Sequence, residues 1–253
     1  MNIHQIEALV KEYQILSKGT VDFNKYTWYS ITHHSTCIEG STLTESQVIN
    51  LLEYGKTAQN KPFEHHLMVK DYFMAMCFII AQSKEKRQIT PELIREIGAM
   101  VMKNTGSEIS TIAGNYDTSK GDFRKGTVRA GTRTFPDYSK VPVLIAELCD
   151  KTNKSLLTAS TFEEKCNLAF SLHFEFVSIH PFGDGNGRTT RLLMNYAQSY
   201  WGLPLSVVFK NDRINYINAL ELSRKTENIE PFLKFMYQQY SKFLNHEIAI
   251  LKK

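Results

Sequence analysis

One segment of this 253-residue sequence constrains the fold more than any other: His-Pro-Phe-Gly-Asp-Gly-Asn-Gly-Arg-Thr-Thr-Arg at residues 180–191. Helical patterns cover residues 161–179 and begin again at Gly187, so the segment includes a short glycine-rich connection between two long helices. Pro181 disfavours helical geometry at His180 and should end the first helix there. The alternating glycines can adopt positive φ and leave backbone N–H groups open beside the positive end of the second helix. This arrangement predicts an anion site suited to a phosphate.

Four side chains of the segment have chemistry that suits phosphate transfer. Arg188 and Arg191 lie one helical turn apart, and two guanidinium groups on one face suit neighbouring phosphates of a di- or triphosphate. Asp184 is the only carboxylate in the loop, and Mg²⁺ is commonly held by one or two carboxylates together with substrate phosphates and water. His180 is placed to take a proton from an incoming hydroxyl, although a nearby helix C-terminus would favour its protonated form. The segment therefore predicts a polyphosphate site with a bound Mg²⁺ and a histidine base.

Each piece of the segment is common when it is taken alone. A His-Pro pair usually marks a turn, and a Gly-Asp-Gly-Asn-Gly run is more often a surface loop than a catalytic one. The combination favours an active site, and it differs from both common nucleotide-binding motifs. A Walker loop needs Gly-Lys-Ser/Thr, and a dinucleotide fingerprint needs a glycine spacing that this segment lacks.

The segment resembles the signature of the Fic-domain family, His-x-Phe-x-(Asp/Glu)-Gly-Asn-Gly-Arg-x-x-Arg, at every fixed position. The resemblance implies a protein adenylyltransferase, which transfers AMP from ATP to a Ser, Thr or Tyr hydroxyl of a target protein. It implies that His180 is the general base and that Asp184 is the Mg²⁺ ligand in the nucleotide site. The other nucleotide contacts implied in this segment are Gly185, Asn186 and Gly187, with the last two at the α-phosphate, Arg188 at the β-phosphate and Arg191 at the γ-phosphate.

A second segment resembles the flap of the same family. Residues 121–136 contain three glycines and several basic and β-branched residues, and the family's flap is a hairpin that holds an extended piece of the target by main-chain hydrogen bonds. Without the resemblance, the stretch would suit an ordinary glycine-rich loop equally well. We expect the target protein to dock at residues 126–135. The nucleotide contacts expected here and further along the chain are Val128, Arg129, Ala130, Gly131 and Tyr216, although a tyrosine between Ile214 and Ile217 is more often a core residue.

A third segment, Ser35-Thr-Cys-Ile-Glu39-Gly40, resembles the family's inhibitory motif, (Ser/Thr)-x-x-x-Glu-(Gly/Asn). The pattern predicts a helix over residues 28–38 with Gly40 as its cap. Glu39 then lies at a helix C-terminus, where the helix dipole disfavours a negative charge by roughly 0.3 to 1 kcal/mol. The resemblance supplies a compensating partner, Arg191, whose pairing with Glu39 would block the γ-phosphate position. Alone, Glu39 would be interpreted as a solvated helix end; beside the first motif it predicts a self-inhibited enzyme, and removal of AMP from the target is also open.

Helical periodicity runs through most of the chain, and we expect an all-α fold: a Fic-type helical bundle with a small β-hairpin flap. Residues 168–176 alternate in the manner of a strand, but the run is long and a capping box at Thr161 and Glu164 favours a central buried helix. We expect an N-terminal helical region over residues 1–60, carrying the inhibitory helix at about 28–40, and a catalytic core with C-terminal helices over residues 61–253. The expected helices cover residues 2–17, 28–38, 45–56, 64–83, 90–103, 140–152, 161–179, 187–201, 212–223 and 229–251.

The composition argues against several other classes of protein. The formal net charge is +4 and the basic residues are dispersed, which does not indicate a nucleic-acid groove. The four cysteines lack Cys-x-x-Cys spacing and indicate neither a disulfide framework nor a zinc site. The N-terminal residues are unlike a signal peptide, and the longest apolar run, residues 73–81, is too short to span a bilayer. We expect a cytoplasmic protein that uses ATP and Mg²⁺ and binds neither nucleic acid nor membrane. A homo-oligomer is compatible with the sequence.

Two alternatives stay open from the sequence. Members of the family also transfer UMP, phosphate or phosphocholine on the same scaffold. The intact Gly187 and Arg188 favour AMP, because the phosphate-transferring branch departs from the motif at those positions. The other alternative is a non-catalytic nucleotide-binding regulator in which Glu39 never releases Arg191.

Overall fold

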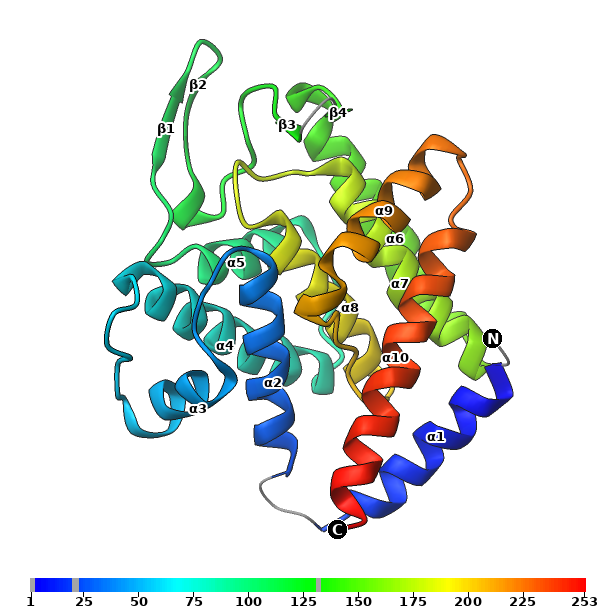
Figure 1. Cartoon of the computed structure of the whole chain (residues 1–253). Coiled ribbons are helices and arrows are strands. Elements are labelled where there is room, and N and C mark those ends of the chain that lie inside the picture. The colour runs from blue at the N-terminus through cyan, green and yellow to red at the C-terminus, as the bar shows by residue number, and fades with distance from the viewer. Residues whose placement is uncertain (1–2, 20–22, 131–132) are drawn as a thin grey trace.

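Helices dominate the computed structural model, which describes residues 3–19, 23–130 and 133–253 (Figure 1). Each helix expected from the sequence is present, with ends shifted by a few residues. The expected architecture, a helical bundle with a small antiparallel hairpin, is confirmed. The helices are α1 (Ile3–Leu16), α2 (Phe23–Ile38), α3 (Glu45–Tyr54), α4 (Phe63–Lys84), α5 (Pro91–Val101), α6 (Val141–Thr158), α7 (Phe162–Ile179), α8 (Asn186–Tyr200), α9 (Arg213–Lys225) and α10 (Glu230–Leu251).

Capping residues in the sequence set several helix ends. Thr44 and Gln47 form a complete capping box at the start of α3, and Thr161 and Glu164 form one at the start of α7. The strand-like alternation at residues 168–176 does not prevent α7 from forming, because the helix buries side chains on several of its faces.

Two helices are longer than the sequence pattern predicted. Helix α2 begins at Phe23 rather than at residue 28, and its first turns are held by an ion pair of 2.7 Å between Lys25 and Glu53 of α3. Helix α6 continues to Thr158 rather than ending at residue 152. The side chain of Asn153 exchanges two hydrogen bonds with the backbone just before α5 and stabilises the added turns. In both cases tertiary contacts extend a helix through a polar stretch with little periodicity of its own.

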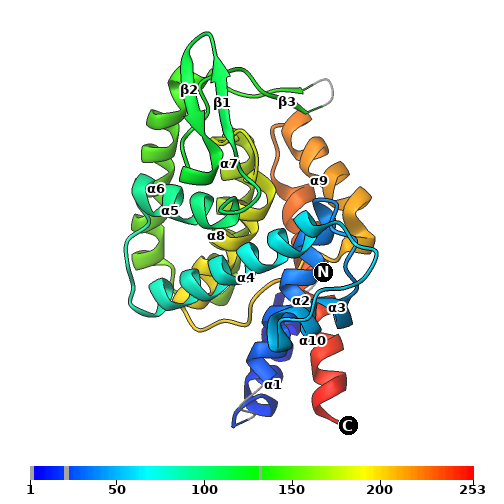
Figure 2. The same ribbon diagram turned by 90° about the vertical axis from the view of Figure 1, so that its left-hand side faces the viewer.

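Two short hairpins stand apart from the helical body (Figure 2). The expected flap is the second one, where Arg129 pairs with Thr134 and Ala130 with Arg133. The first hairpin was not expected, because its four-residue strands contain too few alternating apolar residues to be distinguished from a loop. The strands are β1 (Glu108–Thr111), β2 (Gly114–Asp117), β3 (Arg129–Ala130) and β4 (Arg133–Thr134), and the short 3₁₀ turns are η1 (Thr118–Lys120), η2 (Tyr138–Lys140) and η3 (Lys210–Asp212).

Helices α7 and α8 lie at the centre of the bundle and carry the loop of the first motif between them (Figures 1 and 2). Helix α4 packs against α8, α6 packs against α7, and α10 packs against α9. Twelve of the fifteen residues of α8 are buried, among them the polar residues Asn186, Arg188 and Arg191. The polar residues that the motif contributes to α8 are thus built into the interior.

The N-terminal helices share this interior. Helix α1 packs along α10, and α2 packs against α4 and α8. Ile6, Val10 and Ile31 belong to the same buried apolar cluster as the central helices. The division of the chain at residue 60 stays a prediction.

The longest helices mix charged and apolar residues along their length. Helices α4 and α10 have 22 residues each, and each carries lysine and acidic side chains. Within the described residues, no helix combines the length and the apolar character that crossing a membrane requires.

Candidate active site

His180 occupies the position where α7 ends. Its backbone is left-handed, with φ 55° and ψ 61°, and its N–H still donates to the carbonyl of Phe176 at 3.0 Å. Pro181 disfavours the helical conformation at His180, and the left-handed one costs a non-glycine residue about 1–2 kcal/mol. The imidazole stacks on the ring of Phe135, with 3.9 Å between ring centroids and 19° between the planes. The end of the flap therefore fixes the orientation of the candidate base.

Asn186 closes the loop of the motif with its side chain. Its Oδ1 accepts from the N–H of Phe182 at 3.0 Å, and its Nδ2 donates to the carbonyl of Phe182 at 2.9 Å. Phe182 itself is buried and packs against Gly98 of α5, where no side chain would fit. The amide expected to contact an α-phosphate is thus committed to the loop, and only the backbone N–H of Asn186 is placed for an anion.

We predict that Asn186→Ala lowers the free energy of unfolding by about 2–4 kcal/mol, because it leaves a buried N–H and a buried carbonyl of Phe182 without partners. Urea denaturation measures the change. Asn245→Ala is the matched control, because Asn245 is exposed and its hydrogen bonds are within α10. Equal losses in the two variants would contradict the structural role of Asn186.

Two glycines shape the N-terminus of α8, each for its own reason. Gly185 precedes the helix with φ 80°, in the left-handed region, and no side chain caps the first turn. Gly187 has ordinary φ, but a Cβ there would collide with Oε1 of Glu39. Of the three loop glycines that are free to adopt positive φ, Gly185 does so, whereas Gly183 and Gly187 do not. The carboxylate of Glu39 lies over the open helix N-terminus, where an anion is stabilised.

Arg191 joins this helix to α2. Its side chain is 3% exposed and donates from Nε to Oγ of Ser35 at 2.8 Å and from Nη2 to the carbonyl of Ser35 at 3.0 Å. Nη2 also donates to Oε1 of Glu39 at 2.7 Å. Nη1 has no hydrogen-bond partner among the described residues, and it lies 3.2 Å from the position that a Cβ of Gly187 would take. A buried guanidinium thus directs a free donor at the N-terminus of α8.

Arg188 is equally buried and more weakly bound. Its guanidinium makes contacts of 3.4 Å with the carbonyl of Val101, 3.0 Å with Sδ of Met102 and 3.4 Å with Oδ2 of Asp184. Its Nε has no partner among the described residues. Since a buried donor without a partner is costly, the two arginines together suit an anionic ligand with several oxygen atoms.

Asp184 is the residue of the loop best suited to a cation. Its side chain is 67% exposed, and its Oδ1 accepts from the N–H of Gly185 at 2.6 Å. Within the described part of the chain, no cluster of three His, Cys, Asp or Glu side chains could hold a metal ion without further ligands. One exposed carboxylate next to a phosphate site fits Mg²⁺, which takes its remaining ligands from phosphates and water.

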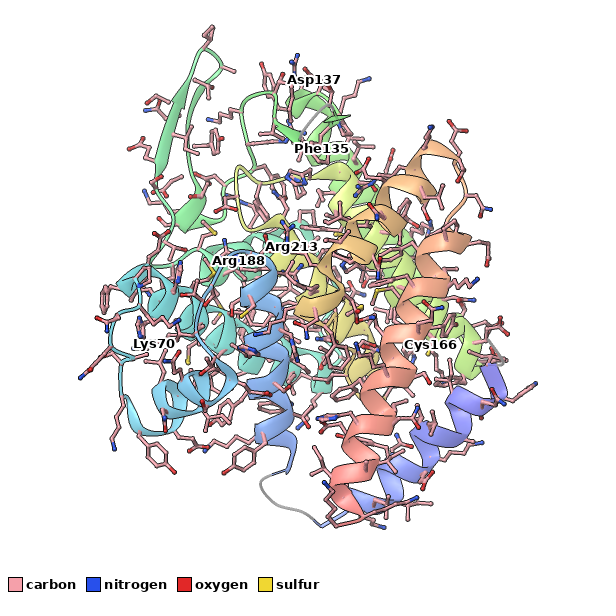
Figure 3. The ribbon with its side chains drawn as sticks, viewed as in Figure 1. Lys70, Phe135, Asp137, Cys166, Arg188 and Arg213 are labelled. Carbon is pink, nitrogen blue, oxygen red and sulfur yellow. The ribbon has the colours of Figure 1, made fainter. Side chains whose placement is uncertain are left out.

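A second arginine holds the end of α2. Arg213, at the start of α9, donates from Nε to the carbonyl of Ile38 at 2.9 Å (Figure 3). This bond satisfies one of the last carbonyls of α2 and places a positive charge at the negative end of the helix. It fixes the residue before Glu39 and so helps to hold the Glu39 carboxylate over Gly187.

Electrostatics keep Glu39 ionised. Burial alone would raise the pKa of its carboxyl, but the charge of Arg191 and the hydrogen bond from it outweigh burial, and the pKa is lowered. Arg188 and Arg213 act in the same direction. Burial opposes the charge of Arg191 in turn, yet Glu39 raises the pKa of Arg191 above its usual value. The pair is therefore charged at neutral pH.

The lowered pKa of Glu39 predicts how its contribution to stability depends on pH. A carboxyl whose pKa is lower in the folded state stabilises the fold above its ordinary pKa of 4.5, and this contribution is lost as the pH falls through the folded-state value. We expect the difference in free energy of unfolding between wild type and Glu39→Gln to be constant near neutral pH and to shrink below pH 4.5. Denaturation at a series of pH values checks this, and a difference that does not change with pH would contradict it.

Tyr216, the nucleotide contact expected in α9, is a buried residue. Its side chain is 2% exposed, and its hydroxyl pairs with Nε2 of His173 at 2.9 Å. Its ring lies among the rings of His173, Phe232 and Phe235. Contact of Tyr216 with a nucleotide stays a prediction.

Four flap residues, Val128 to Gly131, were also expected to contact the nucleotide. Val128 is partly buried just before β3, Arg129 is exposed, and Ala130 is the second residue of β3. Gly131 lies outside the described residues. Contact of these residues with a nucleotide stays a prediction.

Two residues at the site were missed from the sequence. Phe135 packs on His180, and the guanidinium of Arg124 reaches the carbonyl of His180. Arg124 lies in the segment expected to form the flap, and no separate role was predicted for it. Phe135 offered one weak indication in the sequence: a bulky apolar residue at the end of a polar loop often packs against the protein body.

The chain is similar in sequence and in fold to known proteins. Residues 88–197 match the Fic/DOC family. A protein adenylyltransferase Fic from Drosophila willistoni is 31% identical over 212 residues, which are 84% of this chain and 40% of that protein. A Fic domain containing signaling protein from Bacteroides thetaiotaomicron has the same fold, with a TM-score of 0.82 and 23% identity over 98% of this chain and 96% of that one. Fic-1 from C. elegans has a TM-score of 0.82 and 25% identity over 98% of this chain and 71% of that one.

The overlap with the curated relatives is partial on their side. The chain spans 40% of the length of the Drosophila willistoni protein and 41% of its counterpart from Drosophila virilis, to which it is 30% identical. The family match, over residues 88–197, includes the loop between α7 and α8.

Proposed function

Because this chain is a Fic/DOC domain protein, related to protein adenylyltransferases Fic at about 30% identity, we propose that it is a self-inhibited protein adenylyltransferase. It transfers AMP from ATP to the hydroxyl of a Ser, Thr or Tyr side chain on a target protein. The observation that carries the proposal is the convergence of two buried guanidinium groups, each with a free donor, beside the open N-terminus of α8.

The proposed anion site offers three sets of donors to the substrate's phosphates. Arg191 Nη1, the first backbone N–H groups of α8 and the guanidinium of Arg188 lie around the start of this helix, which suits the three phosphates of one nucleotide. Asp184 would hold Mg²⁺, which supplies charge neutralisation on the phosphates. The backbone N–H groups of Asn186 and Gly187 suit the α-phosphate, with Arg188 at the β-phosphate and Arg191 at the γ-phosphate.

The transfer step uses the candidate base. The hydroxyl oxygen of the target forms a bond with the α-phosphorus, the bond between that phosphorus and the bridging oxygen breaks, and pyrophosphate leaves. His180 accepts the hydroxyl proton, which requires a neutral imidazole in a fixed orientation. Phe135, stacked on the ring, supplies that orientation. The charge on the leaving pyrophosphate is stabilised by the two arginines.

Glu39 competes with the substrate for the same place. Its carboxylate lies against Gly187 and pairs with Arg191, so a phosphate oxygen cannot occupy this end of the site while Glu39 remains. The inhibited state is stabilised by the two further hydrogen bonds from Arg191 to Ser35. With Glu39 close to the phosphate position, removal of AMP from the target is included in the proposal as the reverse activity.

The flap is the proposed docking place of the target. In the described part of the hairpin, β3 and β4 pair only with each other, so each has an edge with unpaired backbone groups. An extended target segment that adds to such an edge brings its hydroxyl towards His180, at residues 126–135 of the flap. A cytoplasmic location and a homo-oligomer stay predictions from the sequence.

Product mass tests the chemistry. Wild type, Glu39→Gly and Glu39→Gly/His180→Ala are incubated with ATP and Mg²⁺, alone and with candidate target proteins, and analysed by intact mass. A gain of AMP in Glu39→Gly alone supports the proposal. A gain of phosphate, or of UMP or phosphocholine from the matching donors, would replace it by another transfer on the same scaffold. ATP binding by every variant without any transfer would indicate a nucleotide-binding regulator.

A further inference from the structure

Arg124 is a buried cation in the segment expected to form the flap, and it was not among the expected site residues. Its side chain is 1% exposed, and no carboxylate among the described residues forms a hydrogen bond with it. Burial lowers the pKa of Arg124, although Asp137 and Tyr116 oppose the shift. A buried guanidinium without an ion-pair partner is costly unless its donors are satisfied in other ways. The three acceptors that it uses are therefore informative.

All three acceptors are backbone carbonyls. Nη1 donates to Gly126 at 2.8 Å and Nη2 donates to Pro136 at 2.6 Å, and these residues lie at the two ends of the flap. Nε donates to the carbonyl of His180 at 2.8 Å, and the backbone N–H of Arg124 donates to Pro181 at 2.9 Å. One rigid, planar group thus ties both ends of the flap to the residue that carries the candidate base.

A ring contact reinforces the same connection. Phe135, the neighbour of Pro136, is labelled in Figure 3. It is buried and stacks on the imidazole of His180. The carbonyl of His180 is held from one side by Arg124, and its ring is held by Phe135. Since the left-handed backbone of His180 is unfavourable for a non-glycine residue, its surroundings must hold it in place.

We propose that Arg124 is a positioning residue that couples the target-binding flap to His180, so that the same side chain places the docked hydroxyl and its base. This inference rests on the proposed AMP transfer. Arg124 touches neither the nucleotide site nor Arg188 or Arg191 in the described contacts. Its loss should therefore spoil the alignment of hydroxyl, base and α-phosphorus without weakening the binding of ATP.

The test separates alignment from binding. In the Glu39→Gly background, Arg124→Met removes the three donors and keeps much of the volume, and Arg124→Lys keeps a cation that cannot span all three carbonyls. We expect kcat for AMP transfer to fall about 10²-fold in Arg124→Met and about 10-fold in Arg124→Lys, because small misplacements of reacting groups have effects of this size. The Kd for a non-hydrolysable ATP analogue should change by less than about threefold in both.

Arg95→Met is the matched control. Arg95 binds the same stretch of chain two or three residues upstream, through the carbonyl of Gly121 and the side chain of Asp122, and does not reach His180. Its side chain is half exposed. Its removal should leave kcat within about threefold of the parent.

Hydrogen–deuterium exchange gives a readout that does not depend on catalysis. In Arg124→Met, amides near Gly126 and Pro136 and amides after His180 should exchange faster together, whereas Arg95→Met should affect only the segment near Gly121. If Glu39→Gly transfers AMP and Arg124→Met keeps the kcat of its parent, the coupling is overturned and the proposed function stands. If the affinity for the ATP analogue falls as far as kcat, Arg124 is a general structural residue and the inference is overturned. If no variant transfers AMP, the proposed function fails. Independently of transfer, the coupling is overturned if Arg124→Met speeds exchange only in the flap or only after His180.

Discussion

Glu39→Gly is expected to raise the rate of AMP transfer about 10²-fold, which corresponds to about 3 kcal/mol at 1.4 kcal/mol for each factor of ten. The inhibited state has to break the bond between Glu39 and Arg191 before a phosphate can replace the carboxylate. This bond joins a side chain that is 3% exposed to one that is 31% exposed, so its strength lies between those of surface and buried ion pairs. Glycine removes the competing carboxylate and leaves room over Gly187.

The same substitution has a thermodynamic signature. Without Glu39, the buried Arg191 keeps its bonds to Ser35 but has no anionic partner, so the free protein should be less stable than wild type. ATP with Mg²⁺ supplies the missing anion. We therefore expect ATP to stabilise Glu39→Gly against heat far more than it stabilises wild type, because a ligand that binds only the folded state stabilises it in proportion to its affinity.

Glu85→Gly provides the matched control for this prediction. Glu85 follows the last turn of α4 as Glu39 follows the last turn of α2, and it is exposed. The same change of side chain at an equivalent helix end should leave AMP transfer and the thermal shift with ATP as they are in wild type. The rate is measured by AMP incorporation from labelled ATP. A rate in Glu39→Gly equal to that of wild type would contradict self-inhibition by Glu39.

The sequence predicted the elements of this site better than the use of its side chains. Helix α7, its end at His180 and the start of α8 follow from a capping box, a proline and a helical pattern, which are all local signals. The expected contact of Glu39 with Arg191 is present, although these residues are 152 positions apart. That expectation depended on the family resemblance, since no local pattern links two residues so distant in the chain. The effect of the contact on activity stays a prediction.

Side-chain roles were harder to predict because they depend on partners that residue type does not reveal. Asn186 has the chemistry to bind phosphate, but the backbone of Phe182 takes both ends of its amide. Arg124 has the charge of a surface residue, but it is buried and donates to three backbone carbonyls, which are 2, 12 and 56 positions away in the chain. The β1–β2 hairpin was not predicted because its strands have four residues each and lack a regular apolar alternation.

His180→Ala in the Glu39→Gly background is expected to lower kcat about 10³-fold, within the range that a general base contributes. The imidazole is the only titratable ring of the loop between α7 and α8, and its neighbours Asp184 and Arg188 are committed to the cation and phosphate positions of the proposed site. Water can still accept the proton, so a slow residual rate should remain. Binding of ATP depends on the arginines and the N-terminus of α8, and it should change by less than about threefold.

The comparison between rate and affinity distinguishes a base from a structural residue. If His180 only supported the loop, its removal would release Phe135 and the loop backbone, and ATP affinity and thermal stability would fall together with the rate. His180→Gln addresses this directly, because glutamine keeps a polar side chain of similar length at the left-handed position but cannot act as a base near neutral pH. We expect its kcat to fall as far as that of His180→Ala, with wild-type stability. His246→Ala, at an exposed position near the far end of α10, should leave the rate unchanged. If His180→Gln kept the rate of the Glu39→Gly parent, the role of His180 would be structural. The base would then be another group near the flap.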